Sequence, residues 1–379
     1  MIDTKREGYP NPDRIRQARV ARRVSQAELG EKIGVHRQSI SQYEAGTYRP
    51  KPEIIELLHE VLNFPVAFFY KENIYEHVSP IFFRRFKTAP QKMQEAIRVR
   101  AVWMGEILSY LKEFIDFMPV NIYEIEKKYH EYSLEEIETI ASLTRAFWGL
   151  GLGPISDMIL LLENNGFIVS KFQFGVSELD ASSSMYIGPD GLCPMIFLSG
   201  GKSAVRSRFD AAHELGHIIL HSWVDDEYAS LKENYDRLEN EANNFAGAFL
   251  VPRETIFNEG YALSSISSYI SLKKRWGVSI QALIRRVKNI GMIGEPQYHY
   301  LNKQISYRGY RKKEPYDDEI RHETPQVLKK AIELLYENKI QNVGVICDNI
   351  TLPEDEFTML TGAQLPGNVQ APFIRLLQG

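Results

Sequence analysis

The sequence predicts an α+β fold divided into several domains, and three observations indicate this. The 379 residues exceed the roughly 100–200 residues of a typical domain. Residues 13–62 carry short helical patterns in quick succession, and residues from Ser133 onward alternate between helical and strand-like patterns. We therefore expect an all-α domain at residues 1–70, a linker built on a long helix at 71–132, an α+β domain at 133–293 and a small C-terminal region at 294–379.

The composition narrows the class of protein. Lys and Arg number 45 against 49 Asp and Glu, so the net charge is −4 and any contact with nucleic acid must be local. The two cysteines, Cys193 and Cys347, cannot form a disulfide scaffold and fit a reducing compartment. No apolar run approaches the roughly 18–20 residues of a membrane helix, and the N-terminus lacks a signal-peptide core. We expect a cytoplasmic protein without membrane contact.

Helix start and stop signals place the elements of the first domain. Ser25 and Glu28 form a capping box, in which each side chain satisfies a free N–H at the helix start. Gly34 and Gly46 suit the turns that end helices. The expected helices cover residues 13–23, 26–33, 36–44 and 54–62.

The remaining elements follow from apolar periodicity. Residues 91–118 contain no internal proline and carry apolar residues at three-to-four spacing, which indicates one long amphipathic helix. This helix can link two domains or form a dimer contact. Strands are expected at 166–172, 185–188 and 195–199, the last two joined around Pro189-Asp190-Gly191. Further helices are expected at 133–148, 157–164, 204–222, 238–251, 267–276, 279–290 and 325–338.

The second and third predicted helices form a helix-turn-helix pattern. The second helix of such a unit lies in the DNA major groove, and its first residues face the bases. Here that helix begins at His36 with Arg37 and Gln38, and Gln42 shares its face one turn later. Arg reads guanine and Gln reads adenine through paired hydrogen bonds. Nine basic and three acidic residues lie within residues 14–51, so the local charge favours contact with double-stranded DNA.

Residues 13–69 resemble the phage-repressor, or XRE, type of helix-turn-helix domain. The resemblance rests on Ser25-Gln26-Ala27-Glu28-Leu29-Gly30, Ile33-Gly34-Val35, Ser39-Ile40-Ser41, Tyr43-Glu44-Ala45-Gly46 and Arg49-Pro50. It implies a phosphate contact for Gln26 and base contacts for Arg37, Gln38 and Gln42. Arg22 and Arg23, outside the recognition helix, are expected at phosphates. A homodimer on a two-fold operator is expected. The alternative is a helical domain that binds protein.

A second motif, His213-Glu214-Leu215-Gly216-His217, indicates a metal site. Residues four apart on a helix share one face, so both imidazoles can reach one ion. Zn²⁺ lowers the pKa of its bound water toward 7, and Glu214 can take the released proton as general base. In the alternative interpretation, carboxylates satisfy the two histidines and no metal is bound.

A catalytic zinc needs a third protein ligand. His221 lies two turns, roughly 12 Å, from His213, which is too far to share the ion, so we expect a packing or supporting role. Glu239 and Glu241 lie on the next predicted helix and point in different directions. We favour Glu239, because Asn243 follows one turn later and can orient a ligating histidine.

A family resemblance rests on three segments: Arg206-x-Arg208-Phe209, AHELGHIILH at 212–221 and ExEANxFAxxFLVP at 239–252. Together they resemble the ImmA/IrrE family of zinc metallopeptidases over residues 134–290. The resemblance implies a zincin-like fold with the ligands His213, His217 and Glu239 and the general base Glu214. Zn²⁺ suits these ligands best, with Mn²⁺ and Fe²⁺ as weaker alternatives. Asp210 stands where the family often has a small residue, which concerns only local electrostatics.

The two resemblances together predict a DNA-binding zinc endopeptidase of narrow specificity that regulates transcription. Its expected substrate is a partner repressor or regulatory protein of phage, mobile-element, stress or defence genes. The alternative is a non-proteolytic regulator or antitoxin-like module whose zincin-like domain senses or binds a partner. The stretch Arg308-Gly309-Tyr310-Arg311-x-x-Glu314-Pro315 resembles the C-terminal extension of long members and implies no defined activity.

Overall fold

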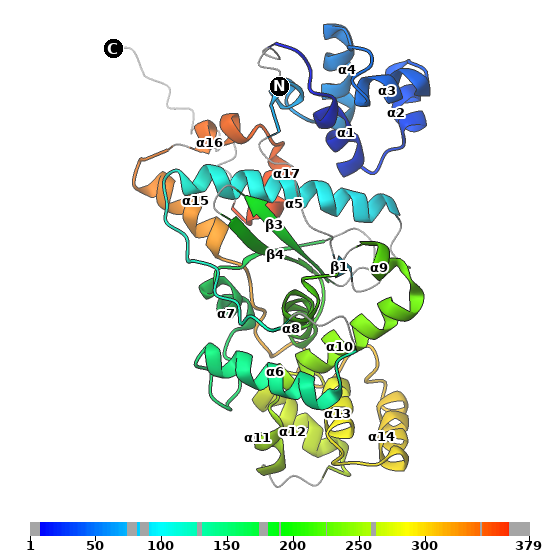
Figure 1. Ribbon diagram of the computed structural model, residues 1–379, viewed down its shortest axis with the longest axis vertical. Helices are drawn as coiled ribbons and strands as arrows, with labels where there is room; N and C mark the ends of the chain where they lie inside the picture. Colours follow the sequence, from blue (N-terminus) through cyan, green and yellow to red (C-terminus); the bar gives the residue numbers. More distant parts are fainter. Residues whose placement is uncertain are drawn as a thin grey trace, which may run out of the picture. The chain divides into compact units, whose positions relative to one another are not determined.

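The computed structural model describes residues 8–73, 82–83, 91–126, 131–173, 181–188, 191–224, 226–258, 263–341 and 343–363. The chain forms two compact units (Figure 1). The helical unit comprises Met1–His77, Pro90–Phe117 and Gln326–Gly379, and the sheet unit comprises Val78–Ala89 and Met118–Pro325. The helical unit is therefore assembled from three separate segments of the chain.

The helical unit begins with the predicted helix-turn-helix domain. Its capping box is present, because Ser25 accepts from the Glu28 N–H and the Glu28 carboxylate accepts from the Ser25 N–H. Gly34 ends the second helix in the left-handed region, with φ of 73°. The elements are α1 (Pro12–Ala21), α2 (Gln26–Ile33), α3 (Arg37–Glu44), α4 (Pro52–Leu62), the 3-10 helix η1 (Val66–Tyr70), α5 (Gln91–Lys112), α15 (Val327–Glu337), α16 (Val343–Ile350) and α17 (Glu354–Thr361).

The expected linker helix belongs to the helical unit, which corrects the predicted domain boundaries. Helix α5 packs against α1 and against all three C-terminal helices. Trp103 on α5 is fully buried, with its ring 5.6 Å from that of Phe64 and 5.7 Å from that of Phe68. The prediction separated these segments because apolar spacing shows that a helix has a buried face, but not which distant segment covers it.

The sheet unit contains the α+β domain. Its elements are β1 (Phe82–Phe83), α6 (Leu134–Phe147), α7 (Met158–Asn164), β2 (Ile168–Phe172), β3 (Ala181–Gly188), β4 (Gly191–Ser199), α8 (Ala204–His221), α9 (Asp226–Ser230), α10 (Lys232–Leu250), α11 (Arg253–Asn258), α12 (Ile266–Trp276), α13 (Ile280–Asn289) and α14 (Glu295–Tyr307). The α+β class predicted from the sequence is confirmed.

The sheet has the strand order β1-β3-β4-β2. Strands β3 and β4 form an antiparallel hairpin in which Ala181 pairs with Leu198 and Gly188 with Gly191, whereas β2 runs parallel to β4. Both hairpin strands begin four residues earlier than expected. The early part of β3 was missed because residues 182–184 are serines, which usually signal a loop. The expected turn residues 189 and 190 lie outside the described residues.

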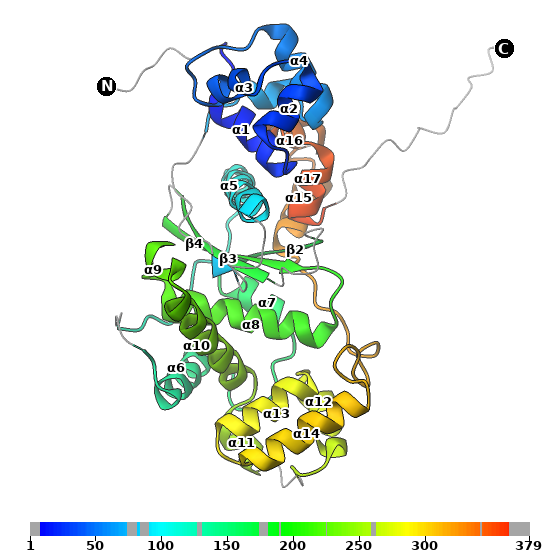
Figure 2. The same cartoon turned by 90° about the vertical axis from the view of Figure 1, so that its right-hand side faces the viewer.

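Helix α8 lies along one face of the sheet, as Figure 2 shows. Its apolar residues Ala211, Ala212 and Leu215 are fully buried in the same core as Phe245 and Phe249 of α10. Burial of this kind removes apolar surface from water and fixes the helix position. The two helices that carry the predicted metal ligands are therefore packed directly against each other.

The predicted C-terminal region is divided between the two units. Residues up to Pro325 belong to the sheet unit, where Glu314 accepts from the Ile280 N–H at 2.8 Å and from Lys273 Nζ at 2.9 Å. Glu314 therefore caps the start of α13 with a carboxylate, a favourable place for negative charge. Helix α14 was not predicted, and helix α15 lies within the predicted range 325–338.

Candidate metal centre and DNA-binding helix

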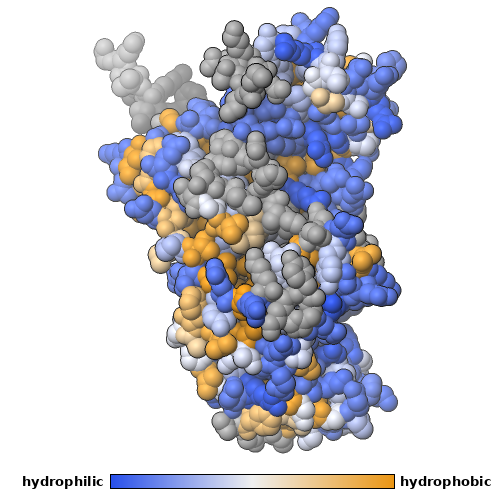
Figure 3. Space-filling model, in the orientation of Figure 1, coloured by the Kyte–Doolittle hydropathy of each residue, from blue (hydrophilic) through white to orange (hydrophobic). Residues whose placement is uncertain are grey.

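Helix α3 presents the residues expected to face DNA. His36 precedes the helix at its N-cap, and it is exposed together with Arg37, Gln38 and Gln42, while Ile40 is fully buried. A helix with an exposed polar face can enter a major groove. The face of this domain visible in Figure 3 is mainly hydrophilic. The base contacts themselves stay a prediction.

Gln26 is held within the domain by a charged pair. Its amide nitrogen donates to Glu44 Oε2 at 2.8 Å, and Arg19 binds both carboxylate oxygens of Glu44 at 2.5 and 2.9 Å. These bonds fix the Gln26 side chain at the start of α2. Arg23, in the turn before α2, is exposed. Phosphate contacts from Gln26 and Arg23 stay predictions.

Arg22, which was also expected at a phosphate, is bound within the helical unit, and its phosphate contact stays a prediction. Its guanidinium donates to Asp355 at 2.6 Å and to Glu356 at 3.1 Å, both on α17, and to the Leu62 carbonyl at 2.8 Å. It also lies over the Phe64 ring, 4.8 Å from the centroid. Two carboxylates therefore bind the group that was expected to meet DNA. Sequence reasoning missed this because the partners lie more than 300 residues away.

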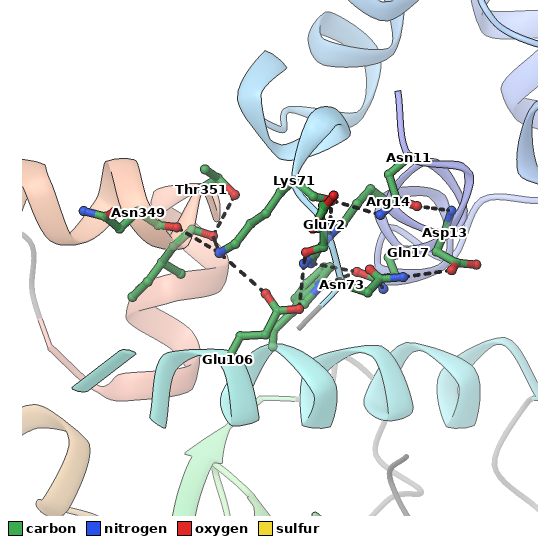
Figure 4. A network of polar contacts seen from close by, with 12 residues as sticks. Asn11, Asp13, Arg14, Gln17, Lys71, Glu72, Asn73, Glu106, Asn349 and Thr351 are labelled. Carbon is green, nitrogen blue, oxygen red and sulfur yellow. Dashed lines mark hydrogen bonds and ion pairs between the residues drawn. The ribbon is translucent and has the colours of Figure 1, made fainter. Parts of the chain in front are cut away.

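A buried polar network joins α1, α5 and α16 within the helical unit (Figure 4). Arg14 Nη2 lies 2.7 Å from Glu106 Oε1, and both side chains are almost fully buried. Lys71 Nζ lies 3.7 Å from Glu106 Oε2 and donates to the carbonyl oxygens of Asn349 and Ile350 at 2.9 Å. Burial lowers the pKa of Lys71, and attraction to Glu106 partly offsets this. Loss of one partner would leave a buried charge unpaired, which is strongly destabilising.

The three predicted metal ligands converge on one point in the sheet unit. His213 and His217 lie on α8, and Glu239 lies on α10. His217 Nε2 is 3.0 Å from His213 Nε2 and 3.1 Å from Glu239 Oε1, and His213 Nε2 is 3.6 Å from Glu239 Oε2. The Glu239 side chain keeps 14% exposure, whereas the imidazoles have 0% and 2%. Solvent therefore reaches the cluster at Glu239.

Gly216, within the motif, allows α8 and α10 to approach closely. A Cβ atom at this position would lie 3.2 Å from the Ala242 backbone and 3.1 Å from the Phe245 ring. Such distances are shorter than ordinary van der Waals contact. The missing side chain therefore brings Glu239 near the two histidines, which gives the glycine a role that spacing alone does not show.

A hydrogen-bonded chain behind His217 determines which of its nitrogens is free. His217 Nδ1 lies 3.0 Å from His221 Nδ1, His221 Nε2 lies 2.8 Å from Glu241 Oε2, and Glu241 Oε1 accepts from the Tyr132 N–H at 3.1 Å. Burial, followed by the charge of nearby histidines, lowers the pKa of His221 well below its usual value. Neutral His221 then donates from Nε2 to Glu241 and accepts at Nδ1 from His217. The lone pair of His217 is thereby left on Nε2, facing the cluster.

Glu214 is fully buried and contacts strand β3 through its carboxylate. Its Oε2 accepts from the Ser183 hydroxyl on β3 at 2.5 Å, and within the described part of the chain its Oε1 has no hydrogen-bond partner. Burial raises the pKa of Glu214 to about 8, although His217 and the Ser183 hydroxyl act in the opposite direction. Ser183 was not predicted, because a serine in an apparent loop carries no functional signal.

Glu239 differs from Glu214 in its electrostatic environment. Burial alone would raise the pKa of Glu239, but the adjacent His213 and His217 outweigh it and lower the pKa to about 2. Asn243 was expected to orient a ligating histidine. Its amide nitrogen instead donates to the Glu239 carbonyl oxygen on the same helix, at 2.7 Å. The residues that do contact His217 from behind are His221, which was expected to pack or to support a ligand, and through it Glu241.

The geometry defines a protein with a helix-turn-helix domain and a metallopeptidase-like site. Residues 15–69 match the family model described as Helix-turn-helix, and residues 173–288 match the peptidase model described as IrrE N-terminal-like domain. The chain thus carries an XRE-type DNA-binding domain and an IrrE-like domain, as the resemblances implied.

Two bacterial proteins share similarity with part of the chain. An uncharacterized HTH-type transcriptional regulator of Sinorhizobium medicae (strain WSM419) is 37% identical over 78 residues, which cover 19% of this chain and 55% of that protein. A second uncharacterized HTH-type transcriptional regulator, from Rhizobium meliloti (strain 1021), matches with the same identity and coverage. The chain spans about half the length of the curated relatives it matches.

No helix in the described ranges is both long and apolar enough to cross a membrane.

Proposed function

We propose that the protein is a DNA-bound transcription regulator that acts as a zinc endopeptidase of narrow specificity on a partner repressor or regulatory protein. The observation that carries this proposal is the convergence of His213, His217 and Glu239 beside Glu214, in a chain that also has a helix-turn-helix domain. The match to the peptidase model described as IrrE N-terminal-like domain supports the peptidase part, and the relatives named as transcriptional regulators support the DNA-binding part.

The donor set fits zinc. Tetrahedral Zn²⁺ with ligand distances near 2.0–2.2 Å separates its ligand atoms by about 3.3–3.6 Å. The three separations here, 3.0, 3.1 and 3.6 Å, lie close to this range. The unsatisfied, buried oxygen of Glu214 also indicates that a polar group belongs beside it. His213, His217 and Glu239 would hold the ion.

The chain's own residues then define the chemistry. A bound zinc polarises a carbonyl and makes water more acidic. Glu214 accepts the proton of the attacking water and can deliver it to the leaving amine. Ser183 donates to one oxygen of this carboxylate at 2.5 Å, and the other oxygen, Oε1, has no hydrogen-bond partner among the described residues. Glu241 and His221 keep His217 in the tautomer that binds a metal.

A peptidase held on DNA meets other proteins bound nearby at high effective concentration. A weak but selective active site is then sufficient, and general proteolysis is not expected. The substrate is expected to be cut in an exposed or locally unfolding segment, where an extended chain can lie across the site.

Metal content tests the first part of the proposal. His217→Ala should remove most bound zinc, whereas Glu214→Gln should keep it, because only the base is changed. Elemental analysis after dialysis measures both. Near-stoichiometric zinc in His217→Ala would contradict the site.

Cleavage tests the second part. Purified protein with zinc and operator DNA is incubated with the product of the adjacent regulatory gene and, separately, with casein. Specific cleavage of the former, absent in Glu214→Gln, is the expected result. If wild type and Glu214→Gln control an operator-driven reporter in cells equally well, the domain senses or binds its partner without cutting it.

A further inference from the structure

A cavity of about 470 Å³ lies in the sheet unit, and residues of α8 and α10, the helices that carry the proposed metal ligands, form part of its wall. Its wall includes Asp210 on α8, about one turn before His213, and Asn243 on α10, about one turn after Glu239. A helical turn rises about 5.4 Å. The cavity therefore begins close to two of the proposed metal ligands, on the two helices that carry them.

The acidic side chains that line this cavity are already paired. Glu138 binds Arg286 through both carboxylate oxygens, and Asp210 lies 2.8 Å from Lys202 Nζ. These two pairs balance four of the seven charged residues in the wall. They leave no negative charge free to neutralise the three arginines that remain.

Arg206, Arg285 and Arg311 are the remaining charged residues of the cavity. None of them forms an ion pair within the described residues. Arg311 is instead oriented by neutral groups, because it donates to Gln281 Oε1 and to the Ser306 hydroxyl at 3.2 Å. Arg206 Nη2 donates to the Arg311 carbonyl oxygen at 3.0 Å. Three guanidinium groups thus share one cavity, two of them held in place by neutral acceptors, and the arrangement suits an anion.

We propose that this cavity is a subsite for an acidic side chain of the peptide substrate. An extended peptide advances about 3.3 Å per residue. A chain lying across the metal ligands would therefore place a side chain in the cavity about two or three residues from the cleaved bond. The identity of this occupant rests on the proposed peptidase function.

The rest of the wall also suits a peptide. Several amide side chains line it and can bind both a carboxylate and a peptide backbone; these are Asn240, Asn243, Asn244, Gln281, Asn289 and Asn302. Arginine forms paired hydrogen bonds with a carboxylate, which lysine cannot do in the same way. An aspartate or glutamate is therefore expected in preference to glutamine of the same size.

Peptide binding to full-length, zinc-loaded Glu214→Gln protein tests this assignment without requiring turnover. The probes are two fluorescein-labelled hexapeptides, Ala-Glu repeated three times and Ala-Gln repeated three times, so that some register places a side chain in the cavity. Fluorescence anisotropy at low salt gives the dissociation constants. The Glu peptide should bind about fivefold more tightly, which is the upper end of the range for one partly exposed ion pair.

Arg285→Gln should remove most of this preference. Its loss should not disturb folding, because the Arg285 side chain makes no hydrogen bond or close ion pair among the described residues, and Glu295, which it attracts at longer range, keeps its pair with Lys288 at 2.7 Å. Lys303→Gln, which replaces an exposed cation on α14 outside the cavity, is the matched control and should keep it. Equal affinity for the two peptides would overturn the proposal. The proposal would also be overturned if inorganic pyrophosphate or a hexathymidylate bound tightly in a manner that depends on Arg285, while the Glu and Gln peptides bound equally well.

The same titration after chelation separates this proposal from the proposed function. The three arginines are not metal ligands, so the preference for the Glu peptide should persist when zinc is removed. If the protein binds no zinc and cleaves nothing but still prefers the Glu peptide, the proposed peptidase function is contradicted and the acidic-peptide subsite stands. A protein that cleaves its partner but shows no preference would contradict the subsite alone.

Discussion

At the scale of residues, the positions of the protons on His221 and His217 decide which nitrogen of His217 is free to bind a cation. Glu241 accepts from His221, and His221 accepts from His217, so the order of three hydrogen-bonding groups leaves one lone pair facing Glu239. Burial lowers the pKa of His221 and favours its neutral form, which can accept a hydrogen bond from His217, whereas a charged His221 could not. The site is therefore prepared for a cation before one arrives.

Removal of this support should weaken the metal without changing a ligand. Glu241→Ala should lower zinc affinity about 10- to 100-fold, because His217 loses its fixed tautomer. Glu241→Gln should retain most of the affinity, since its amide oxygen can still accept from His221. A chelator competition measures both constants. Glu233→Ala, exposed on the same helix, is the control, and an affinity of Glu241→Ala equal to that of the control would contradict the proposed chain.

The cluster of His213, His217 and Glu239 was predictable because the spacing of these residues carries geometric information. Two histidines four apart must share a helix face, and a carboxylate on the next helix can complete the set. Ser183 and Glu241 carry no such pattern, and their roles depend on distances between segments. The partners of Arg22 could not be predicted for the same reason: its charge favours DNA in the sequence, whereas in the structure it binds Asp355 and Glu356.

At the scale of elements, the packing of α8 on α10 determines whether the ligands meet. Gly216→Val should place branched carbon atoms against Ala242 and Phe245, where even a Cβ would lie at 3.1–3.2 Å. Overpacking of this kind typically destabilises by about 1–3 kcal/mol. We expect a lower melting temperature together with weaker zinc binding, measured by calorimetry and chelator competition.

A glycine substitution on the facing helix serves as the control. Gly247→Ala should be tolerated, because its Cβ would lie 3.5 Å from Arg286 Cδ, an ordinary contact. Unchanged zinc affinity in Gly216→Val would show that α10 can move without separating Glu239 from the histidines. The helices themselves were well predicted from periodicity, but the closeness of their approach depends on which atoms face each other across the interface.

Helix α3 is the element expected to determine operator choice. Arg37→Ala should weaken binding by about 1–3 kcal/mol at one base pair and relax the preference there, because a bidentate contact with guanine is lost. Affinity should also fall steeply with salt as phosphate contacts are broken. Mobility-shift titrations against single-base operator variants measure both effects. Lys330→Ala, an exposed cation on α15, is the control, and an equal loss in both variants would argue against base reading by Arg37.

At the scale of the whole molecule, the order of domains along the chain differs from their assembly. The sequence predicts a helix-turn-helix domain, a linker, a peptidase-like domain and a C-terminal region. In the structure, α5 and the last three helices complete the unit that begins with the helix-turn-helix domain. Local patterns predict the longer amphipathic helices, such as α5, α8 and α15, but miss α14, α16 and α17. They contain no information on pairings such as Arg22 with Glu356, because such contacts depend on the path of the chain.

This assembly predicts that the C-terminal helices stabilise the DNA-binding domain. Glu356 on α17 is almost fully buried and binds Arg22 at 3.1 Å and Arg100 at 2.8 Å. Glu356→Ala would leave two guanidinium groups without this partner. The Arg22 and Arg100 side chains are partly exposed, and Arg22 keeps its ion pair with Asp355. The free energy of unfolding should therefore fall by about 1–3 kcal/mol, less than the 3–5 kcal/mol expected for a fully buried pair.

Urea unfolding followed by circular dichroism measures this loss, and operator titration reports its effect on the DNA-binding domain. We expect a lower unfolding midpoint and weaker operator binding, with specificity unchanged because α3 is untouched. Glu354→Ala removes an exposed carboxylate from the same helix and should alter neither quantity. If Glu356→Ala unfolds at the same urea concentration as Glu354→Ala, the C-terminal helices contribute nothing to the stability of the domain that they cover.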